Sequence, residues 1–232
     1  MVRFAGNSRW HAPWGVAAMS KAKRYLPGTF YEVTRRCVER AHKLTPNHPS
    51  NRKHSSSVAQ LYQYATARYA KRYGIEVIAV CVMSNHIHEV LFDRSGKISQ
   101  FLQARNKMLA DTVKVRYGLP SNVFDKPDGT YNRLEGTTAI ADKIAYAMAN
   151  PVEAGLVASP EEWPGMISSV EDLFGATTDV ARPREYLAQN DKTNAPTVKF
   201  RIGAPKEAVE LFGSVTEMAM QVASHLSKKI KA

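Results

Sequence analysis

Two histidines separated by one residue, His86 and His88 in the segment SNHIHEVLF (84–92), are the strongest candidates for chemistry in this chain. The apolar run IEVIAVCVM (75–83) precedes them and predicts a strand, a tight turn and an antiparallel partner strand. Residues two apart on a strand point to one face, so both imidazoles face one way and Ile87 faces the other. Two imidazoles on one rigid face can bind one metal ion. The bare spacing, however, is more typical of two ordinary polar residues on a solvated strand.

A further ligand for such a metal ion is offered by a predicted helix downstream. Tyr146 and Asn150 are four residues apart, so on a helix they lie on one face, one turn apart. Asn150 offers a carbonyl oxygen, which suits Mg²⁺ or Mn²⁺, and Tyr146 offers a phenolic oxygen. The alternative is that Tyr146 packs in the core and Asn150 caps the helix before Pro151. Both interpretations fit the spacing.

The order of the predicted elements determines where these side chains can meet. Strands are predicted over 28–40, 75–83 and 86–93, helices over 57–73, 97–118 and 138–150, and one further short strand fits within 122–136. The third helix is predicted to end at Asn150, because proline disfavours the helical conformation of the residue before it. This order predicts an α+β fold, an antiparallel sheet with helices on one face.

The C-terminal part of the chain has weaker signals. Residues 177–197 are polar and contain two prolines, which predicts a linker. A last amphipathic helix is predicted over 206–229, where apolar residues recur at helical spacing. Its apolar stripe must be buried against the core of the same chain or against a second copy.

The composition limits the classes of partner and compartment. The 232 residues carry a formal net charge of +11, which favours a polyanionic partner, either nucleic acid or an anionic membrane surface. Two cysteines, Cys37 and Cys81, are too few for a disulfide framework and are expected to be buried thiols in a reducing compartment. No apolar run approaches the ~20 residues that span a bilayer. A segment with the length and hydrophobicity of a secretory signal is also missing, so we expect a cytoplasmic protein.

Two segments resemble the signatures of a known family. SNHIHEVLF resembles the Asn-His-hydrophobic-His segment of the HUH single-tyrosine transposases, which include the IS200-like enzymes. YAMANPVEAGLVASPEEWPGMISS (146–169) resembles the second signature of the REP-associated tyrosine transposase branch: a Tyr four residues before Asn-Pro-Val, then Ala-Gly-Leu-Val, a Pro, a Trp-Pro and serines. GTFYEVTRRCVERAH (28–42) resembles the first strand of the family. The resemblance covers about residues 28–170, whereas residues 1–27 and 177–232 match no motif, and the Trp often found before the tyrosine helix is missing.

The resemblance implies a fold, a site and a reaction. The fold would be ferredoxin-like, with the catalytic tyrosine on a helix packed near the histidine strand. Residues 1–27 would be an N-terminal extension, 28–170 the nuclease domain, and 171–232 a C-terminal linker and helix. His86, His88 and Asn150 would hold Mg²⁺ or Mn²⁺. Tyr146 would attack a DNA phosphate and form a 5′-phosphotyrosine with a free 3′-OH.

The substrate implied by the resemblance is single-stranded or hairpin DNA, such as REP-like palindromes. A monomer is expected for this branch. The alternative is a dimer that exchanges the tyrosine helix between subunits. The candidate phosphate contacts, each also typical of a plain solvated charge, are Arg35, Arg36, Lys114 and Arg116.

Two other classes of function remain open from the sequence. The first is a DNA-binding protein that does not cleave and acts as a repressor or structural factor. The second is a metal-dependent phosphodiesterase that uses water in place of tyrosine and leaves no covalent adduct.

Overall fold

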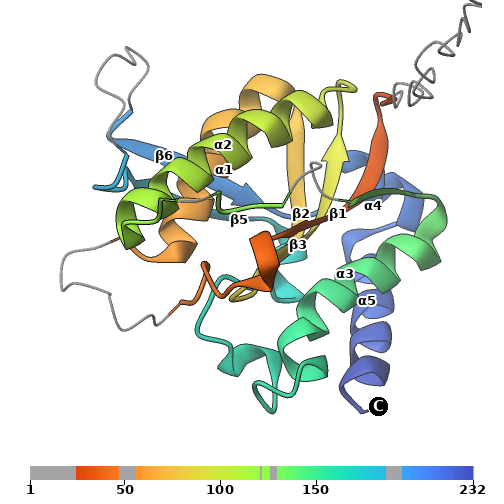
Figure 1. Cartoon of the computed structure of the whole chain (residues 1–232). Helices are drawn as coiled ribbons and strands as arrows, with labels where there is room; N and C mark the ends of the chain where they lie inside the picture. Colours follow the sequence, from red (N-terminus) through yellow and green to blue (C-terminus); the bar gives the residue numbers. More distant parts are fainter. Residues whose placement is uncertain (1–24, 47–55, 121, 126–129, 187–194, 232) are drawn as a thin grey trace, which may run out of the picture.

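A six-stranded mixed sheet with helices on both faces forms the fold (Figure 1). The computed structural model describes residues 25–46, 56–120, 122–125, 130–186 and 195–231. The strands are β1 Thr29–Arg36, β2 Ile75–Val82, β3 His86–Asp93, β4 Thr130–Leu134, β5 Ala176–Ala181 and β6 Thr197–Ile202. The helices are α1 Val58–Tyr73, α2 Ile98–Tyr117, α3 Gly136–Glu153, α4 Lys206–Phe212 and α5 Val215–Ile230. Short 3₁₀ turns lie at Val38–Arg40, Pro160–Glu162 and Glu171–Phe174.

The strand order in the sheet is β4-β1-β3-β2-β6-β5. Every neighbouring pair is antiparallel except β2 and β6, which run parallel. The α+β class is therefore confirmed, and the sheet is mixed rather than wholly antiparallel. The register of β1 on β3 places Thr34 opposite His88 and Arg36 opposite His86, so these β1 side chains lie on the same sheet face as the histidines.

Helices cover both faces of the sheet, so the prediction of helices on one face was wrong. Figure 1 shows α1 and α2 above the sheet and α3 and α5 below it. The central strands carry apolar residues on both faces of the sheet, so both faces must be covered by helices. Buried residues on the α1 and α2 side include Tyr62, Phe101, Leu109, Val33 and Leu91. Those on the α3 and α5 side include Ile144, Met148, Met218, Val222, Val90 and Phe92.

The ends of α1 follow from its flanking residues, whereas the end of α3 does not. The Ser57 side chain accepts a hydrogen bond from the Gln60 amide at 3.0 Å, and Gly74 closes α1 with a left-handed φ of 65°. The prediction that α3 ends at Asn150 was wrong, because the helix continues through Pro151 to Glu153. Proline removes one N–H donor, but the Ala154 amide still donates to the Asn150 carbonyl at 3.1 Å. Asn150 therefore belongs to the body of α3 and is not its cap.

The C-terminal part is more structured than the sequence indicated. The predicted linker at 177–197 contains most of β5 and the first residue of β6. Residues 187–194 of this linker lie outside the described part of the chain, as do residues 1–24 of the predicted N-terminal extension. The predicted single helix at 206–229 is two helices, α4 and α5. Gly213, with a φ of 88°, separates them, and the Ser214 side chain caps α5 by accepting from the Glu217 amide at 3.0 Å.

The outer edge of β2 is covered by two segments. The segment 163–168 pairs with one end of the strand: the Val82 amide donates to the carbonyl of residue 166 at 2.8 Å, and the Ser168 amide donates to the Val80 carbonyl at 2.9 Å. The Trp163 indole N–H also donates to the Val82 carbonyl at 3.1 Å. Strand β6 pairs with the other end. The Trp-Pro and serine elements of the second signature thus have a structural role at the edge of the sheet.

The two cysteines are buried thiols, as the sequence predicted. Burial raises the pKa of Cys37 to about 11 and that of Cys81 to about 12, so both stay protonated and unreactive at neutral pH. Among the described residues, no helix has both the length and the hydrophobicity needed to cross a bilayer.

A buried ion pair fixes the histidine strand from behind. Glu89 of β3 and Arg105 of α2 are fully buried and form two parallel hydrogen bonds, with guanidinium-to-carboxylate distances of 2.8 and 2.7 Å. The Tyr62 hydroxyl of α1 donates to the same carboxylate. Since Glu89 lies between His88 and Val90, this contact sets the position of β3 against both helices.

Replacing Glu89 with Ala is expected to lower the free energy of unfolding by about 3–5 kcal/mol, because Arg105 is left as an unpaired buried charge. The measurement is equilibrium unfolding in urea. Asp111→Ala is the matched control, since it breaks the exposed Lys107–Asp111 pair on the same helix, and it should cost less than about 1 kcal/mol. Equal losses for both variants would contradict the prediction.

Candidate active site

The structure brings His86, His88, Tyr146 and Asn150 together within one chain. Both histidines lie on the face of β3 that is covered by α3. The rings of His88 and Tyr146 meet edge to face with centroids 5.2 Å apart. The His86 Nε2 atom lies 3.2 Å from the Asn150 Oδ1 atom. The two imidazoles themselves are perpendicular, with centroids 4.6 Å apart.

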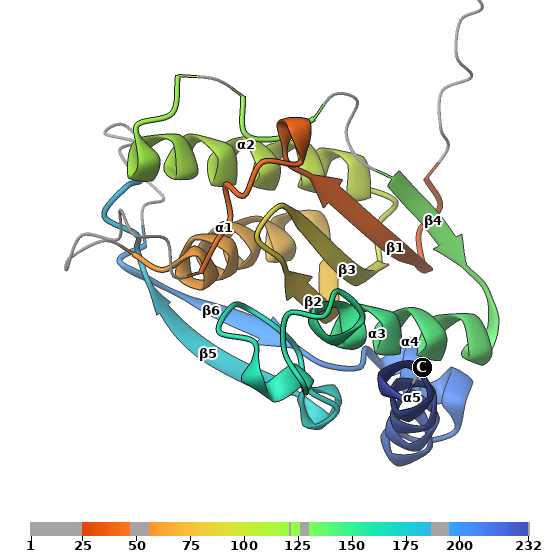
Figure 2. The ribbon, with the colours of Figure 1, turned by 60° about the horizontal axis from the view of Figure 1, so that its bottom comes forward.

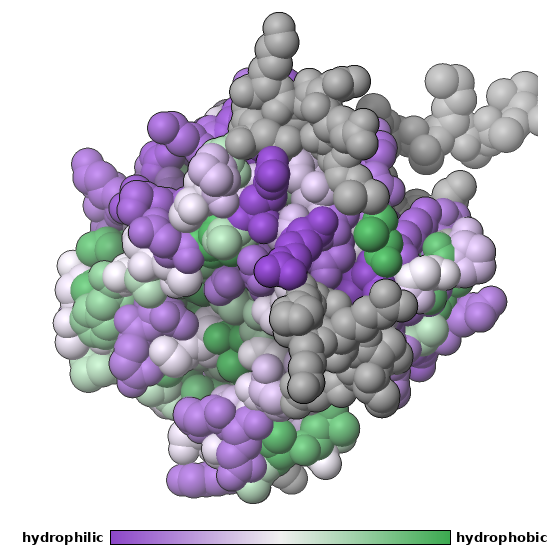
Figure 3. All heavy atoms as spheres, turned by 90° about the vertical axis from the view of Figure 1, so that its left-hand side faces the viewer, coloured by the Kyte–Doolittle hydropathy of each residue, from purple (hydrophilic) through white to green (hydrophobic). Residues whose placement is uncertain are grey.

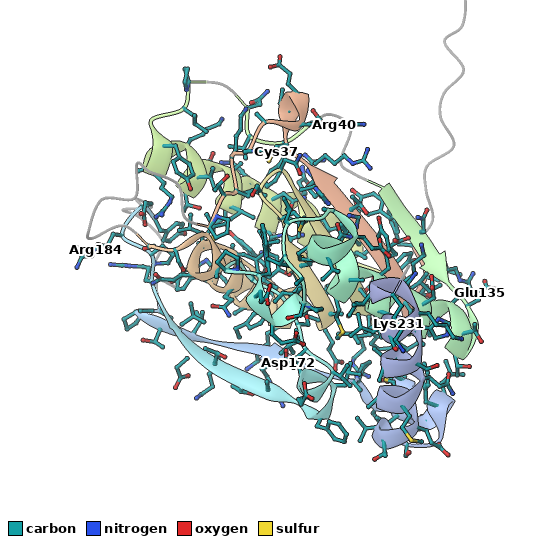
Figure 4. The ribbon with its side chains drawn as sticks, turned by 90° about the horizontal axis from the view of Figure 1, so that it is seen from below. Cys37, Arg40, Glu135, Asp172, Arg184 and Lys231 are labelled. Carbon is teal, nitrogen blue, oxygen red and sulfur yellow. The ribbon has the colours of Figure 1, made fainter. Side chains whose placement is uncertain are left out.

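The Nδ1 atom of each histidine contacts a side chain that the sequence did not single out. His86 Nδ1 lies 2.6 Å from Asn85 Oδ1, and His88 Nδ1 lies 3.0 Å from Thr34 Oγ1. The Asn85 amide is itself oriented, because its Nδ2 donates to the Arg40 carbonyl at 3.2 Å (Arg40 is labelled in Figure 4). Thr34 becomes a neighbour of His88 only through the pairing of β1 with β3.

The contact between His86 and Asn150 has the chemistry of a metal site. The Asn150 Nδ2 atom donates to the Tyr146 carbonyl at 3.4 Å, which turns Oδ1 toward His86. A neutral imidazole has one N–H, so it can donate to only one of the two oxygens, Asn85 Oδ1 or Asn150 Oδ1. In the tautomer with the proton on Nδ1, the Nε2 lone pair is available to coordinate a metal ion next to Asn150 Oδ1. Two adjacent ligands of an octahedral Mg²⁺, each at about 2.1 Å, are about 3.0 Å apart, close to this separation.

These residues could hold a divalent cation: the amide oxygen suits Mg²⁺ or Mn²⁺, whereas imidazole nitrogens suit transition-metal ions. Over the described ranges, no group of three His, Cys, Asp or Glu side chains could hold a metal, so a third protein ligand beside the two histidines would have to be of another type. The Asn150 side chain offers an amide oxygen 3.2 Å from His86 Nε2.

Burial keeps both imidazoles neutral. It lowers the pKa of His86, and it lowers that of His88 to about 3, where the neighbouring His86 and the charges of Arg36 and Lys143 act in the same direction. The neutral imidazole is the form that coordinates metal ions. Metal binding at neutral pH would therefore require no loss of a proton from either imidazole.

Positive charge gathers around Tyr146. The ammonium groups of Lys143 and Lys229 lie 5.3 and 5.5 Å from the centroid of its ring. Lys143 also pairs with Glu32 at 3.4 Å. The sequence carried a signal for Lys143, which is three residues before Tyr146 and so on the same helix face. It carried none for Lys229, which comes from α5.

The four predicted phosphate contacts are separated by the sheet. Arg36 is exposed and lies on the histidine face, opposite His86. Arg35 is 6% exposed and stacks over the Phe124 ring on the other face. Lys114 and Arg116 belong to α2, which also covers the other face, and Arg116 is paired with a buried glutamate at 3.4 Å. Only Arg36 of the four is next to the histidines.

Solved transposase structures are similar to this chain. A REP-associated tyrosine transposase bound to a REP hairpin matches with a TM-score of 0.50 and 20% identity, over 63% of this chain and 81% of that one. A putative transposase from Deinococcus radiodurans R1 matches with a TM-score of 0.34 and 18% identity, over 50% of this chain and 85% of that one. No family model and no curated protein sequence matches the chain. The chain therefore has the fold of a REP-associated tyrosine transposase, as the two sequence signatures implied.

Proposed function

We propose that this chain cleaves and rejoins single-stranded DNA through a 5′-phosphotyrosine intermediate that depends on a divalent metal. The observation that carries the proposal is the placement of the Tyr146 ring against His88, one helical turn from the oxygen that Asn150 directs at His86. A nucleophile next to a metal-binding donor set is the arrangement that phosphoryl transfer to tyrosine requires. The fold shared with a tyrosine transposase supports the same reaction.

In the first step, Tyr146 Oη forms a bond to phosphorus while the bond from phosphorus to the 3′ oxygen breaks. The phenolic proton passes to water, and the departing 3′ oxygen takes a proton from water. A Mg²⁺ or Mn²⁺ ion held by His86, His88 and Asn150 would supply a Lewis acid for a phosphoryl oxygen. In the second step, a 3′-OH attacks the phosphotyrosine and Oη leaves with a proton. No nucleotide cofactor is needed, because the ester conserves the energy of the phosphodiester bond.

Single-stranded or hairpin DNA is the proposed substrate, with REP-like palindromes as the first sequences to try. The similar transposase was solved with a REP hairpin. The net charge of +11 favours a polyanion. On the face shown in Figure 3, a group of hydrophilic side chains lies above the centre, with hydrophobic side chains on either side of it. Because Tyr146 lies next to His88 of its own chain, we propose that one chain carries out the reaction and that a dimer is not required.

A denaturing gel with end-labelled single-stranded DNA tests the proposal. The expected result is a labelled band that runs with the protein and disappears after protease treatment. Cleaved DNA without such a band would indicate a phosphodiesterase that uses water. Binding in a native gel without cleavage would indicate a DNA-binding protein. Either of these two results would overturn the proposal.

Removal of divalent cations should abolish cleavage and leave binding to DNA largely intact. Excess EDTA withdraws the Lewis acid, whereas contacts between lysine or arginine and phosphate do not depend on it. Adding back Mg²⁺ or Mn²⁺ should restore the adduct, and adding back Na⁺ at equal ionic strength is the control. Full activity in EDTA would refute the metal site.

A further inference from the structure

Helix α5 is fixed along α3, the helix that carries Tyr146. Figures 1 and 2 both show the two helices side by side. Met218 and Val222 of α5 are fully buried and belong to the same hydrophobic core as Ile144 of α3. In Figure 4, the labelled Lys231 marks the end of α5 beside α3. The last turn of α5 is therefore held near the candidate active site by apolar packing.

Two side chains from this last part of α5 converge on Asp142 of α3. The Lys229 ammonium lies 3.0 Å from Asp142 Oδ1, and His225 Nδ1 lies 3.6 Å from the same oxygen. Asp142 is one helical turn before Tyr146, and Lys229 also reaches to 5.5 Å from the Tyr146 ring centroid. The Lys229 side chain is 21% exposed, so it is only partly buried.

Lys143, which lies on α3, makes the same two kinds of contact as Lys229. It pairs with a carboxylate, Glu32, and its ammonium lies 5.3 Å from the same ring centroid. Each ammonium has three N–H donors, and one carboxylate does not use them all. Both ammonium groups keep a carboxylate partner and also lie against the ring of Tyr146. The remaining N–H donors of these two cations can therefore bind an added anion beside the Tyr146 ring.

We propose that Lys229 and Lys143 form a phosphate-binding pair at Tyr146, so that the C-terminal helix α5 completes the active site. The pair would hold the non-bridging oxygens of the phosphate that Tyr146 attacks, and of the phosphotyrosine that follows. This inference rests on the proposed function and adds a helix from outside the segment that carries the family signatures. Cations that are fixed beside the phosphoryl group, where negative charge develops during the reaction, stabilise the transition state more than the free substrate.

Single-turnover adduct formation in Lys229 variants tests the pair. Lys229→Met keeps the aliphatic stem but removes the charge, and it should slow adduct formation about 10- to 100-fold. Lys229→Arg keeps the charge and should stay within about threefold of the parent. Lys228→Met removes an exposed charge from the neighbouring position of the same helix and should have less than about a twofold effect. Equal rates for Lys229→Met and Lys228→Met would overturn the inference.

A binding measurement separates this inference from the reaction itself. Fluorescence anisotropy with single-stranded DNA is measured over a range of salt, in a Tyr146→Phe background that cannot react. Lys229→Met should lower the slope of log affinity against log salt by about one, and Lys228→Met should not. If the parent forms no adduct but this difference is found, the proposed reaction fails and the phosphate pair stands. If the two variants bind alike, the phosphate pair fails.

Discussion

Replacing Tyr146 with Phe is expected to abolish the covalent adduct and strand cleavage, by at least about 10⁴-fold, as the loss of an enzymatic nucleophile does. The phenylalanine ring can keep the edge-to-face contact with His88 and the positions near Lys143 and Lys229, so only the nucleophilic oxygen is lost. Affinity for single-stranded DNA should stay within about threefold, since phosphate contacts supply most of that affinity. The labelled denaturing gel and an anisotropy titration measure the two quantities.

Tyr131→Phe is the matched control for this variant. Tyr131 is the nearest tyrosine before α3 in the sequence. It lies on β4 opposite Val33, on the sheet face that α1 and α2 cover, and its ring contacts Tyr25 with centroids 6.0 Å apart. Its loss should therefore leave adduct formation unchanged. An adduct that survives in Tyr146→Phe would assign the reaction to another residue.

Removing either imidazole should have the next largest effect. His86→Ala and His88→Ala each delete a metal donor, and we expect cleavage to fall roughly 10³-fold, because a Lewis acid contributes several kcal/mol to phosphoryl transfer. The measurement is adduct formation at saturating Mg²⁺ and again at Mn²⁺. His42→Ala, which changes an exposed histidine in the loop after β1, is the control and should be fully active. Activity of both site variants equal to that of the control would refute their role.

Mixing the inactive variants also distinguishes reaction within one chain from reaction between chains. His88→Ala retains Tyr146, and Tyr146→Phe retains both histidines. Since the two groups are neighbours in one chain, the mixture should form no adduct. Recovery of activity on mixing would show that Tyr146 acts on a site in a second copy.

Local patterns in the sequence predicted much of the region that holds the site. The alternation of SNHIHEVLF set the common face of His86 and His88, and the spacing of four residues set that of Tyr146 and Asn150. Caps such as Ser57 and Gly74 marked the ends of α1. These features depend on residues near each other in the chain, and such interactions can be read from periodicity. The family signatures supplied the expectation that the two faces meet.

The parts that the sequence did not predict depend on contacts between distant residues. Nothing around residue 34 indicates that Thr34 will bond to His88, since the contact requires the pairing of β1 with β3. Lys229 lies 83 residues after Tyr146 and approaches it only because α5 packs on α3. Strands β5 and β6 lack strong apolar alternation, because much of their surface remains exposed.

The covered edge of β2 determines how copies of this chain could join through their sheets. An open strand edge offers unpaired main-chain groups on which another chain can add a strand. At β2, the segment containing Trp163 and Ser168 and the strand β6 already use those groups. In the part of the chain that the structure describes, the outermost strands are β4 and β5. Strand addition would therefore begin at β4 or β5 and extend the sheet in its own plane, without displacing α3 from the face of β3 that carries the two histidines.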